Sequence, residues 1–479
     1  MYQTKLIQLL KSFDKNEIRQ FESFLEAPYF NTSKKTLAFY KILIYYYPDF
    51  ESPKLSKERV YQKMHGHQPY SDPTMRDLIT VLFRLAKEFV SHQELKNIPF
   101  NASNNRYVWF VQRGLTKISE QELIYCDELL HSKVTKDYEY YYQRWIADYN
   151  ENHYQSEVLK GLEHKLSKNK EHNHHLRSLD KYYLLHLLGA YIYQLNMAKI
   201  YNAPVDSSGT AHIEELGQKY TGSGDILIDV FYNMYQLLKN GDEKHYFELK
   251  SIFLSSDISI EQPVMTEVSI NLQNYCMQKL REGDTRFGSE IMEIYRFVVD
   301  RELMTEGGKV PYSFYKNAVI TAVDFLDIDW AKQFAEKYRI MLPPQFGDEV
   351  YNFSRAYVLL AERKFDEALN IAMYVGAFND FTKLDIKNLV ARIHYELGMF
   401  DQLYTLLNSY AHHLNRETMS ISRKENNRLF ASFMKQLADL NQQYSLENWK
   451  RLSAEINQTP AFTNKRWFQE KMTEMSGKG

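Results

Sequence analysis

Apolar residues recur at spacings of three and four along almost the whole chain, a pattern typical of amphipathic helices. Near the start, Asp14 and Glu17 have the spacing of a capping box and are followed by an apolar face that includes Ile18 and Phe21. Pro28 ends this helix, since its ring cannot continue one. A helix with one buried face is therefore predicted to begin at Asp14 and to end before Pro28.

Further helices are predicted in the first hundred residues. One runs from about Ser33 to Ile44, Ser56 caps another, and Pro73 suits the first turn of a long helix over 75–93. The apolar residues of that long helix share one face, which indicates packing: Leu78, Val81, Leu82, Leu85 and Phe89. Residues 1–100 are therefore predicted to form an N-terminal helical module.

The stretch D-Y-E-Y-Y-Y-Q-R-W-I-A-D-Y-N, residues 137–150, carries six aromatic side chains in fourteen residues. At about 100° per residue, most of them fall on one side of a helix, which favours a packing stripe over a stacking platform for bases. The predicted stripe is Val134, Tyr138, Tyr141, Tyr142, Trp145 and Tyr149. Tyr140 lies outside it, so it either covers a second neighbour or is an exposed aromatic available to a partner.

Residues 202–224, with A-P-V-D-S-S-G-T and T-G-S-G-D, are predicted to be the least helical segment and the best boundary. After it, five helix-turn-helix junctions can be superimposed. Their matching aromatic or apolar positions are spaced 41, 41, 37 and 35 residues apart: Tyr246, Phe287, Ile328, Phe365 and Phe400. A period of this length is that of one helical hairpin.

The last two hairpins resemble tetratricopeptide repeats, whose period is about 34 residues. In A-Y-V-L-L-A-E-R-K-F-D-E-A-L-N-I-A, Ala356 fits the small residue of the first helix, Phe365 the aromatic residue after the turn, and Ala368 a small residue of the second helix. The next hairpin departs at Leu403, where Ala is usual. The resemblance covers about residues 349–412 and implies that hairpins stack into a superhelix.

A second resemblance begins at the N-terminus, in K-S-F-D-K-N-E-I-R-Q-F-E-S-F-L-E-A-P-Y-F-N, Y-P-D-F-E-S-P-K-L-S-K-E-R-V and Q-P-Y-S-D-P-T-M-R-D-L. These runs are similar to the opening of a family of uncharacterised bacterial helical proteins whose C-terminal halves carry tetratricopeptide-like hairpins. The resemblance implies architecture and brings no activity. The expected fold is all-α: an N-terminal module (1–100), a long-helix region (101–202), a solenoid of hairpins (225–415) and C-terminal capping helices (416–479).

Composition agrees with helices, because the 479 residues include only 18 Gly and 12 Pro. The formal charge is −2, and residues 1–100 carry 15 Lys and Arg against 11 Asp and Glu, so no strong field attracts nucleic acid or an anionic membrane. Cys126 and Cys276 are the only cysteines, which excludes a disulfide framework and paired zinc ligands. Without a signal peptide or a membrane span, we expect a cytoplasmic protein.

No phosphate-binding, dinucleotide, zinc-protease, hydrolase or calcium-loop motif occurs in the sequence. The strongest candidate metal ligands are His164, His172 and His175, and no carboxylate or thiol completes a set. Weaker candidates are the pairs His65 with His67 and His412 with His413. Lysines over 160–181 alternate with acids, which is typical of a solvated helix face. We therefore expect no enzymatic activity, no cofactor and no metal.

The function predicted from these features is a scaffold that binds a protein or peptide on a helical-repeat surface. Candidate partner-binding residues lie on the first helices of the last two hairpins, with the aromatic outlier added: Asn352, Arg355, Lys387, Asn388, Arg392 and Tyr140. The alternative is a regulator with a nucleic-acid-binding N-terminal module and a ligand-sensing repeat domain. The sequence leaves the identity of the partner and the oligomeric state open.

Overall fold

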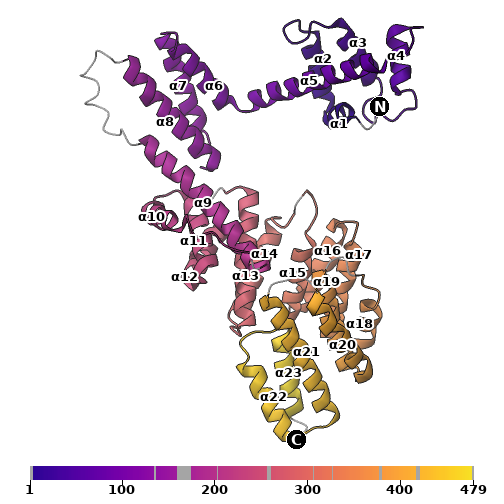
Figure 1. Cartoon of the computed structure of the whole chain (residues 1–479). Helices are drawn as coiled ribbons and strands as arrows, with labels where there is room; N and C mark the ends of the chain where they lie inside the picture. Colours follow the sequence, from indigo (N-terminus) through magenta and orange to yellow (C-terminus); the bar gives the residue numbers. More distant parts are fainter. Residues whose placement is uncertain are drawn as a thin grey trace. The chain divides into compact units, whose positions relative to one another are not determined.

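The computed structural model describes residues 4–133, 136–158, 174–201, 203–255, 260–305, 307–325, 327–376, 380–416 and 421–476. Across these ranges the chain forms 23 α-helices and contains no β-strand (Figure 1). The predicted all-α class is confirmed. None of the helices in these ranges combines the length and apolar character that crossing a bilayer requires.

The contacts of the chain divide into two compact units. The first unit comprises Met1–Lys133 and Gln143–His172, and the second comprises Val134–Tyr142 and Asn173–Gly479. The helices of the first unit are α1 (Lys5–Ser12), α2 (Lys15–Glu26), α3 (Lys34–Ile44), α4 (Lys57–His65), α5 (Asp72–Asn97), α6 (Pro99–Val111), α7 (Thr116–His131) and most of α8 (Tyr138–Val158). The division between the units therefore falls within α8.

Helices α1 to α5 enclose one apolar core. The predicted capping box of α2 is present, since the Asp14 carboxylate accepts from the Glu17 N–H at 2.8 Å and the Glu17 carboxylate accepts from the Asp14 N–H at 2.7 Å. Phe21 is fully buried at the centre, and Leu82 and Leu85 of α5 are buried against it. The predicted packing face of the long helix is confirmed.

Ion pairs join helices α6, α7 and α8. Arg106 of α6 forms a two-pronged ion pair with Glu122 of α7, at 2.7 and 2.9 Å. Arg144 of α8 contacts Asp127 of α7 at 2.6 Å and also Asp148 one turn along α8. Apolar side chains are buried in the same helices, among them Phe100 and Tyr107 of α6 and Cys126 and Leu130 of α7.

The helices of the second unit after the start of α8 are α9 (His174–Tyr201), α10 (Thr210–Tyr220), α11 (Ile226–Asn240), α12 (Glu243–Leu254), α13 (Gln262–Arg281), α14 (Phe287–Asp300), α15 (Tyr312–Asp324), α16 (Ile328–Tyr338), α17 (Gly347–Ala361), α18 (Phe365–Ala372), α19 (Asp380–Glu396), α20 (Phe400–Arg416), α21 (Ile421–Gln442), α22 (Leu446–Gln458) and α23 (Lys465–Ser476). A short 3-10 helix, Arg339–Met341, follows α16.

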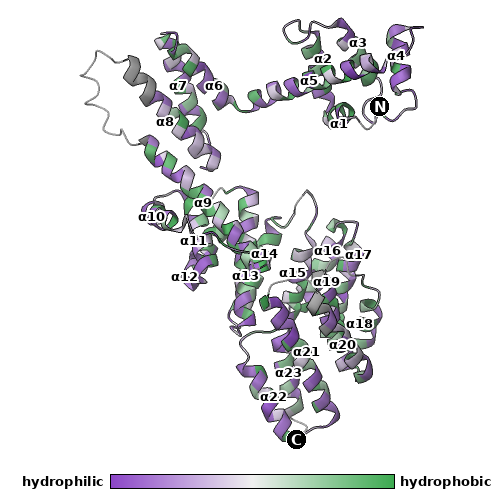
Figure 2. Cartoon of the chain, viewed as in Figure 1, coloured by the Kyte–Doolittle hydropathy of each residue, from purple (hydrophilic) through white to green (hydrophobic). Residues whose placement is uncertain are grey.

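Helices α11 to α20 pair as five hairpins, and in each the second helix packs on the first and also contacts the first helix of the next. Four of the five repeated positions, Phe287, Ile328, Phe365 and Phe400, are the first residues of α14, α16, α18 and α20. Apolar and polar residues are interspersed along these helices (Figure 2), and the buried apolar residues belong to two core clusters. The predicted helix-turn-helix junctions are confirmed, and stacking into a solenoid stays a prediction.

Small residues sit where helices approach each other closely. Ala356 and Ala368 are fully buried, and so is Leu403, at the position where the resemblance expected Ala. Helices α19 to α23 form a second apolar core of this unit, which includes Phe430 and Phe468. The C-terminal helices are thus integrated with the last hairpin.

Two predictions of local structure are wrong. Residues 202–224 were predicted to be the least helical segment, but they contain α10, which packs on α9. In α8, Tyr142 and Tyr149 are exposed, whereas Gln143 and Asp148 are buried. The reason is that α8 buries different faces along its length: its first residues pack in the second unit, and its later residues pack in the first. The four-part division of the chain stays a prediction.

Candidate interaction surfaces

Asn352 and Arg355 of α17 lie three residues apart, so they share one face of that helix. Arg355 is exposed and Asn352 is half-buried. Neither side chain forms a hydrogen bond or an ion pair with another residue in the described ranges. This face of α17 therefore offers a guanidinium and an amide that the chain does not use internally.

Helix α13 presents a similar face. Ile270, Asn274 and Arg281 follow each other at spacings of four and seven, and all three are exposed. The Ile270 side chain retains 49% of its accessible surface. Surrounding protein and the positive charge of Arg423 lower the pKa of the Arg281 guanidinium, and the negative charge of Asp385 partly opposes them. The face thus combines an apolar residue with an arginine that no carboxylate of the described ranges pairs directly.

Arg392 of α19 is used inside the protein. Its side chain is buried, and Nη1 donates a hydrogen bond of 2.7 Å to the Tyr357 hydroxyl of α17. That hydroxyl donates to the Asp324 carboxylate of α15 at 3.1 Å. Burial raises the pKa of this carboxyl. The guanidinium also lies over the Trp467 ring of α23, 5.5 Å from its centroid.

Asn388, one turn earlier on α19, is also buried. Its Nδ2 donates to Asn427 Oδ1 of α21 at 3.2 Å, and the Tyr410 hydroxyl of α20 lies 2.6 Å from its Oδ1. Lys387 donates to Ser409 Oγ of α20 at 2.9 Å, and burial lowers the pKa of its ammonium group. All three candidate residues on α19 are thus engaged within the chain.

Side chains of α23 also contact α19. Trp467 Nε1 donates to the Glu396 carboxylate of α19 at 3.1 Å, and Lys471 forms an ion pair with the same carboxylate at 2.7 Å. Just before the helix, Asn464 donates to the Tyr357 hydroxyl at 3.4 Å. Helices α21 and α23 therefore occupy the side of α19 that the sequence assigned to a partner, while the candidates on α17 stay accessible.

Tyr140 is half-buried and packs against the large core of the second unit. Its backbone N–H donates to the Asp137 carboxylate at 2.7 Å, and its ring meets that of Tyr141 edge-on, with centroids 5.1 Å apart. Tyr140 therefore covers a neighbouring part of the core and is not a fully exposed aromatic residue.

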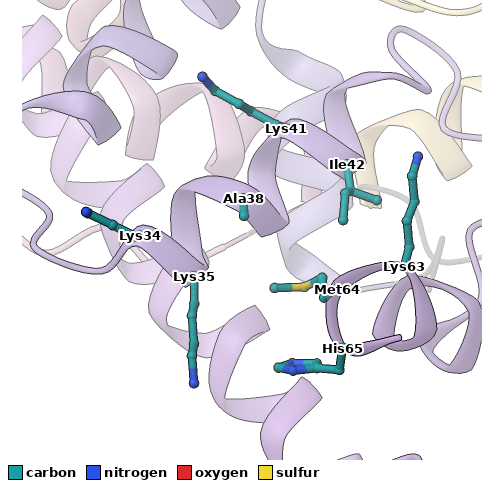
Figure 3. Close-up of a pocket in the computed structure, with 8 residues that line it drawn as sticks. All are labelled: Lys34, Lys35, Ala38, Lys41, Ile42, Lys63, Met64 and His65. Atoms are coloured by element: carbon teal, nitrogen blue, oxygen red, sulfur yellow. The ribbon is translucent and has the colours of Figure 1, made fainter. Parts of the chain in front are cut away.

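A basic groove lies between α3 and α4 in the first unit, with a volume of about 550 Å³. In Figure 3, the Met64 and His65 side chains extend from α4 toward α3. Lysines of both helices line the groove, among them Lys35 and Lys63. No motif in the sequence predicted this groove. The only signal is a set of four lysines, Lys34, Lys35, Lys41 and Lys63, which the fold brings together.

Among the described residues, no three His, Cys, Asp or Glu side chains lie close enough together to hold a metal ion. Two of the three histidines considered as metal ligands, His164 and His172, lie outside the described residues, as do most of the lysines of 160–181. Cys126 and Cys276 are both buried, as predicted. Burial raises the pKa of the Cys276 thiol to about 12, which makes it a poor nucleophile.

No family model, no curated protein and no solved structure matches the chain. The resemblance of the N-terminal runs to a bacterial family and the likeness of the last hairpins to tetratricopeptide repeats therefore stay expectations. The structure establishes the fold class: the chain is an all-α protein of packed helices, which is compatible with a helical-repeat protein.

Proposed function

We propose that the chain is a non-enzymatic interaction scaffold that binds a protein or peptide on the first helices of its tetratricopeptide-like hairpins, α13 and α17 in particular. One observation supports this proposal most. Arg281 and Arg355 are polar groups on first helices that form no ion pair within the described residues, whereas Asn388 and Arg392 of α19 are engaged by the chain's own helices.

The chemistry of these faces suits a partner with both acidic and apolar groups. Arginine forms two parallel hydrogen bonds with a carboxylate and is enriched at binding hot spots. Ile270 would contribute about 1 kcal/mol if a partner buried its exposed half, by the usual cost of apolar surface in water. The two faces together would therefore support recognition of a short acidic segment or of a folded surface that carries one.

A pull-down from the native cytoplasm tests the proposal, with the full chain as bait. We expect one stoichiometric protein partner with the wild type and its loss with the double variant Arg281→Glu, Arg355→Glu. A matched control reverses one exposed charge on a second helix, Glu367→Arg of α18, and should retain the partner. Recovery of no stoichiometric partner, or equal recovery by the double variant, would refute the proposal.

A further inference from the structure

The groove between α3 and α4 combines an apolar floor with a basic rim. Ala38 and Ile42 of α3 and Met64 of α4 supply the apolar lining. Ile42 and Met64 also pack against the N-terminal core, so the floor is fixed by the fold. The volume of about 550 Å³ falls within the range of about 300–1,000 Å³ that is typical of ligand sites.

The rim carries four lysines and no carboxylate. Lys41 is already paired with Glu26 at 2.9 Å and with Glu22 at 3.2 Å. Lys34 and Lys35 are exposed and form no ion pair in the part of the chain that the structure describes. Two ammonium groups at the start of α3 are thus available, and the positive end of the helix dipole adds to their field.

His65 and Lys63 supply the opposite wall. The Nε2 atom of His65 is buried and has no hydrogen-bond partner, while its ring lies against the Tyr61 ring with centroids 4.5 Å apart. Lys63 is exposed and lies near the Tyr45 ring, 5.6 Å from its centroid.

We propose that this groove binds a short acidic peptide segment, with one apolar side chain on the floor and carboxylates at Lys35 and Lys63. The lining of α3 runs from Lys34 to Ile42, about 12 Å at 1.5 Å per residue, which matches two turns of a helical peptide. The inference concerns the first unit and does not depend on the surface proposed for α13 and α17.

Charge distribution favours a peptide over a nucleic-acid strand. A strand needs a continuous basic track for successive phosphates, but Glu22 and Glu26 lie beside Lys41 at one edge of the groove. A peptide with a few carboxylates can place them at the other edge, where the lysines are unpaired. The apolar floor also contributes to peptide binding and gives nothing to a phosphate backbone.

Fluorescence anisotropy with the full chain tests the proposal. The probes are fluorescein-labelled decapeptides with four Glu or Asp around one Leu, Phe or Trp, and the same peptides with every acid replaced by Gln. We expect at least one acidic peptide to bind and its Gln counterpart to bind at least about tenfold more weakly, since two or three ion pairs are lost. Lys35→Glu with Lys63→Glu should weaken binding by a similar factor.

Two further variants separate the groove from general charge. Lys15→Glu with Lys96→Glu changes the net charge equally on exposed positions that do not line the groove, and should leave binding within about twofold. Ala38→Phe fills the floor without a charge change and should also weaken binding about tenfold. The proposal is overturned if no acidic peptide binds, if both charge pairs act alike, or if oligothymidylate or phosphatidylserine vesicles displace the peptide more effectively than unlabelled peptide does.

Discussion

Replacement of Arg392 by Met should loosen the C-terminal helices. Methionine keeps most of the buried stem but removes the guanidinium. The hydrogen bond to the Tyr357 hydroxyl is lost, a charged bond worth about 1.5–3 kcal/mol. Contacts with the Tyr357 and Trp467 rings, with centroids 5.0 and 5.5 Å away, are worth about 0.5–1 kcal/mol each.

Part of this loss is offset, because the buried charge no longer has to be desolvated. The Asp324 carboxyl, however, loses its nearest buried cation, and its raised pKa should rise further. We therefore expect a net destabilisation of about 3 kcal/mol in the contacts between α17, α19 and α23. A free energy of this size corresponds to about 100-fold faster local opening.

Hydrogen–deuterium exchange with mass spectrometry measures this opening helix by helix. Amides of α19 and α23 should exchange about 100-fold faster in Arg392→Met, while those of α1 to α5, which belong to a separate core, should be unchanged. The matched control is Arg355→Met, an exposed arginine whose replacement should change exchange by less than about twofold. Exchange in α23 within threefold of the wild type would refute the role given to Arg392.

Three further predictions follow from single sites. Cys276 should resist iodoacetamide at pH 8 in the folded chain and react after unfolding in urea, as measured by mass spectrometry, because its pKa is raised to about 12 and its side chain is fully buried. Gly288→Ala should lower the free energy of unfolding by at least about 2 kcal/mol in a urea titration, since the new Cβ would lie 2.0 Å from the Phe325 ring, although Ala is normally the better helix residue. The hydrogen bond from Arg106 lowers the pKa of the Glu122 carboxyl. The stabilisation that this carboxylate gives to the α6–α7 pair is therefore present above pH 4.5 and is lost as the pH falls below that value. Hydrogen exchange of the α6 and α7 amides measures this loss.

Each of these has an outcome that contradicts it. Rapid alkylation of Cys276 in the folded chain would mean that α13 opens easily. An unchanged or raised stability of Gly288→Ala would show that α14 does not pack closely on Phe325. Glu122→Gln should remove the pH dependence of α6 and α7, and persistence of that dependence would assign it to other carboxyls.

Local signals in the sequence predicted the helices well. The Asp14 capping box and the turn before Phe365 depend on residues a few positions apart, so their chemistry is visible in the sequence itself. Periodicity failed in α8, where Tyr142 and Asp148 occupy the wrong sides, because the helix buries one face in one unit and another face in the other. A hydrophobic pattern assumes a single buried face for the whole helix.

The sequence also could not predict polar contacts between residues far apart in the chain, as the candidate partner-binding residues of α19 show. Asn388 and Arg392 are polar, and a polar helix position is normally exposed, so the sequence placed them on a partner surface. Their actual partners are 39 and 35 residues away, in Asn427 and Tyr357, and Asn464 reaches Tyr357 across 107 residues. No spacing rule within a helix reveals a polar contact between helices so far apart.

Site-specific photo-crosslinking tests most directly whether a partner binds the open faces of the first helices α13 and α17. A photo-reactive phenylalanine analogue would replace Ile270 or Arg355, and Glu367 on α18 as the control position. Illumination in the native cell should join the same protein to the chain from positions 270 and 355 and not from 367. Crosslinks from position 367 alone, or equal crosslinking from all three positions, would contradict partner binding on α13 and α17.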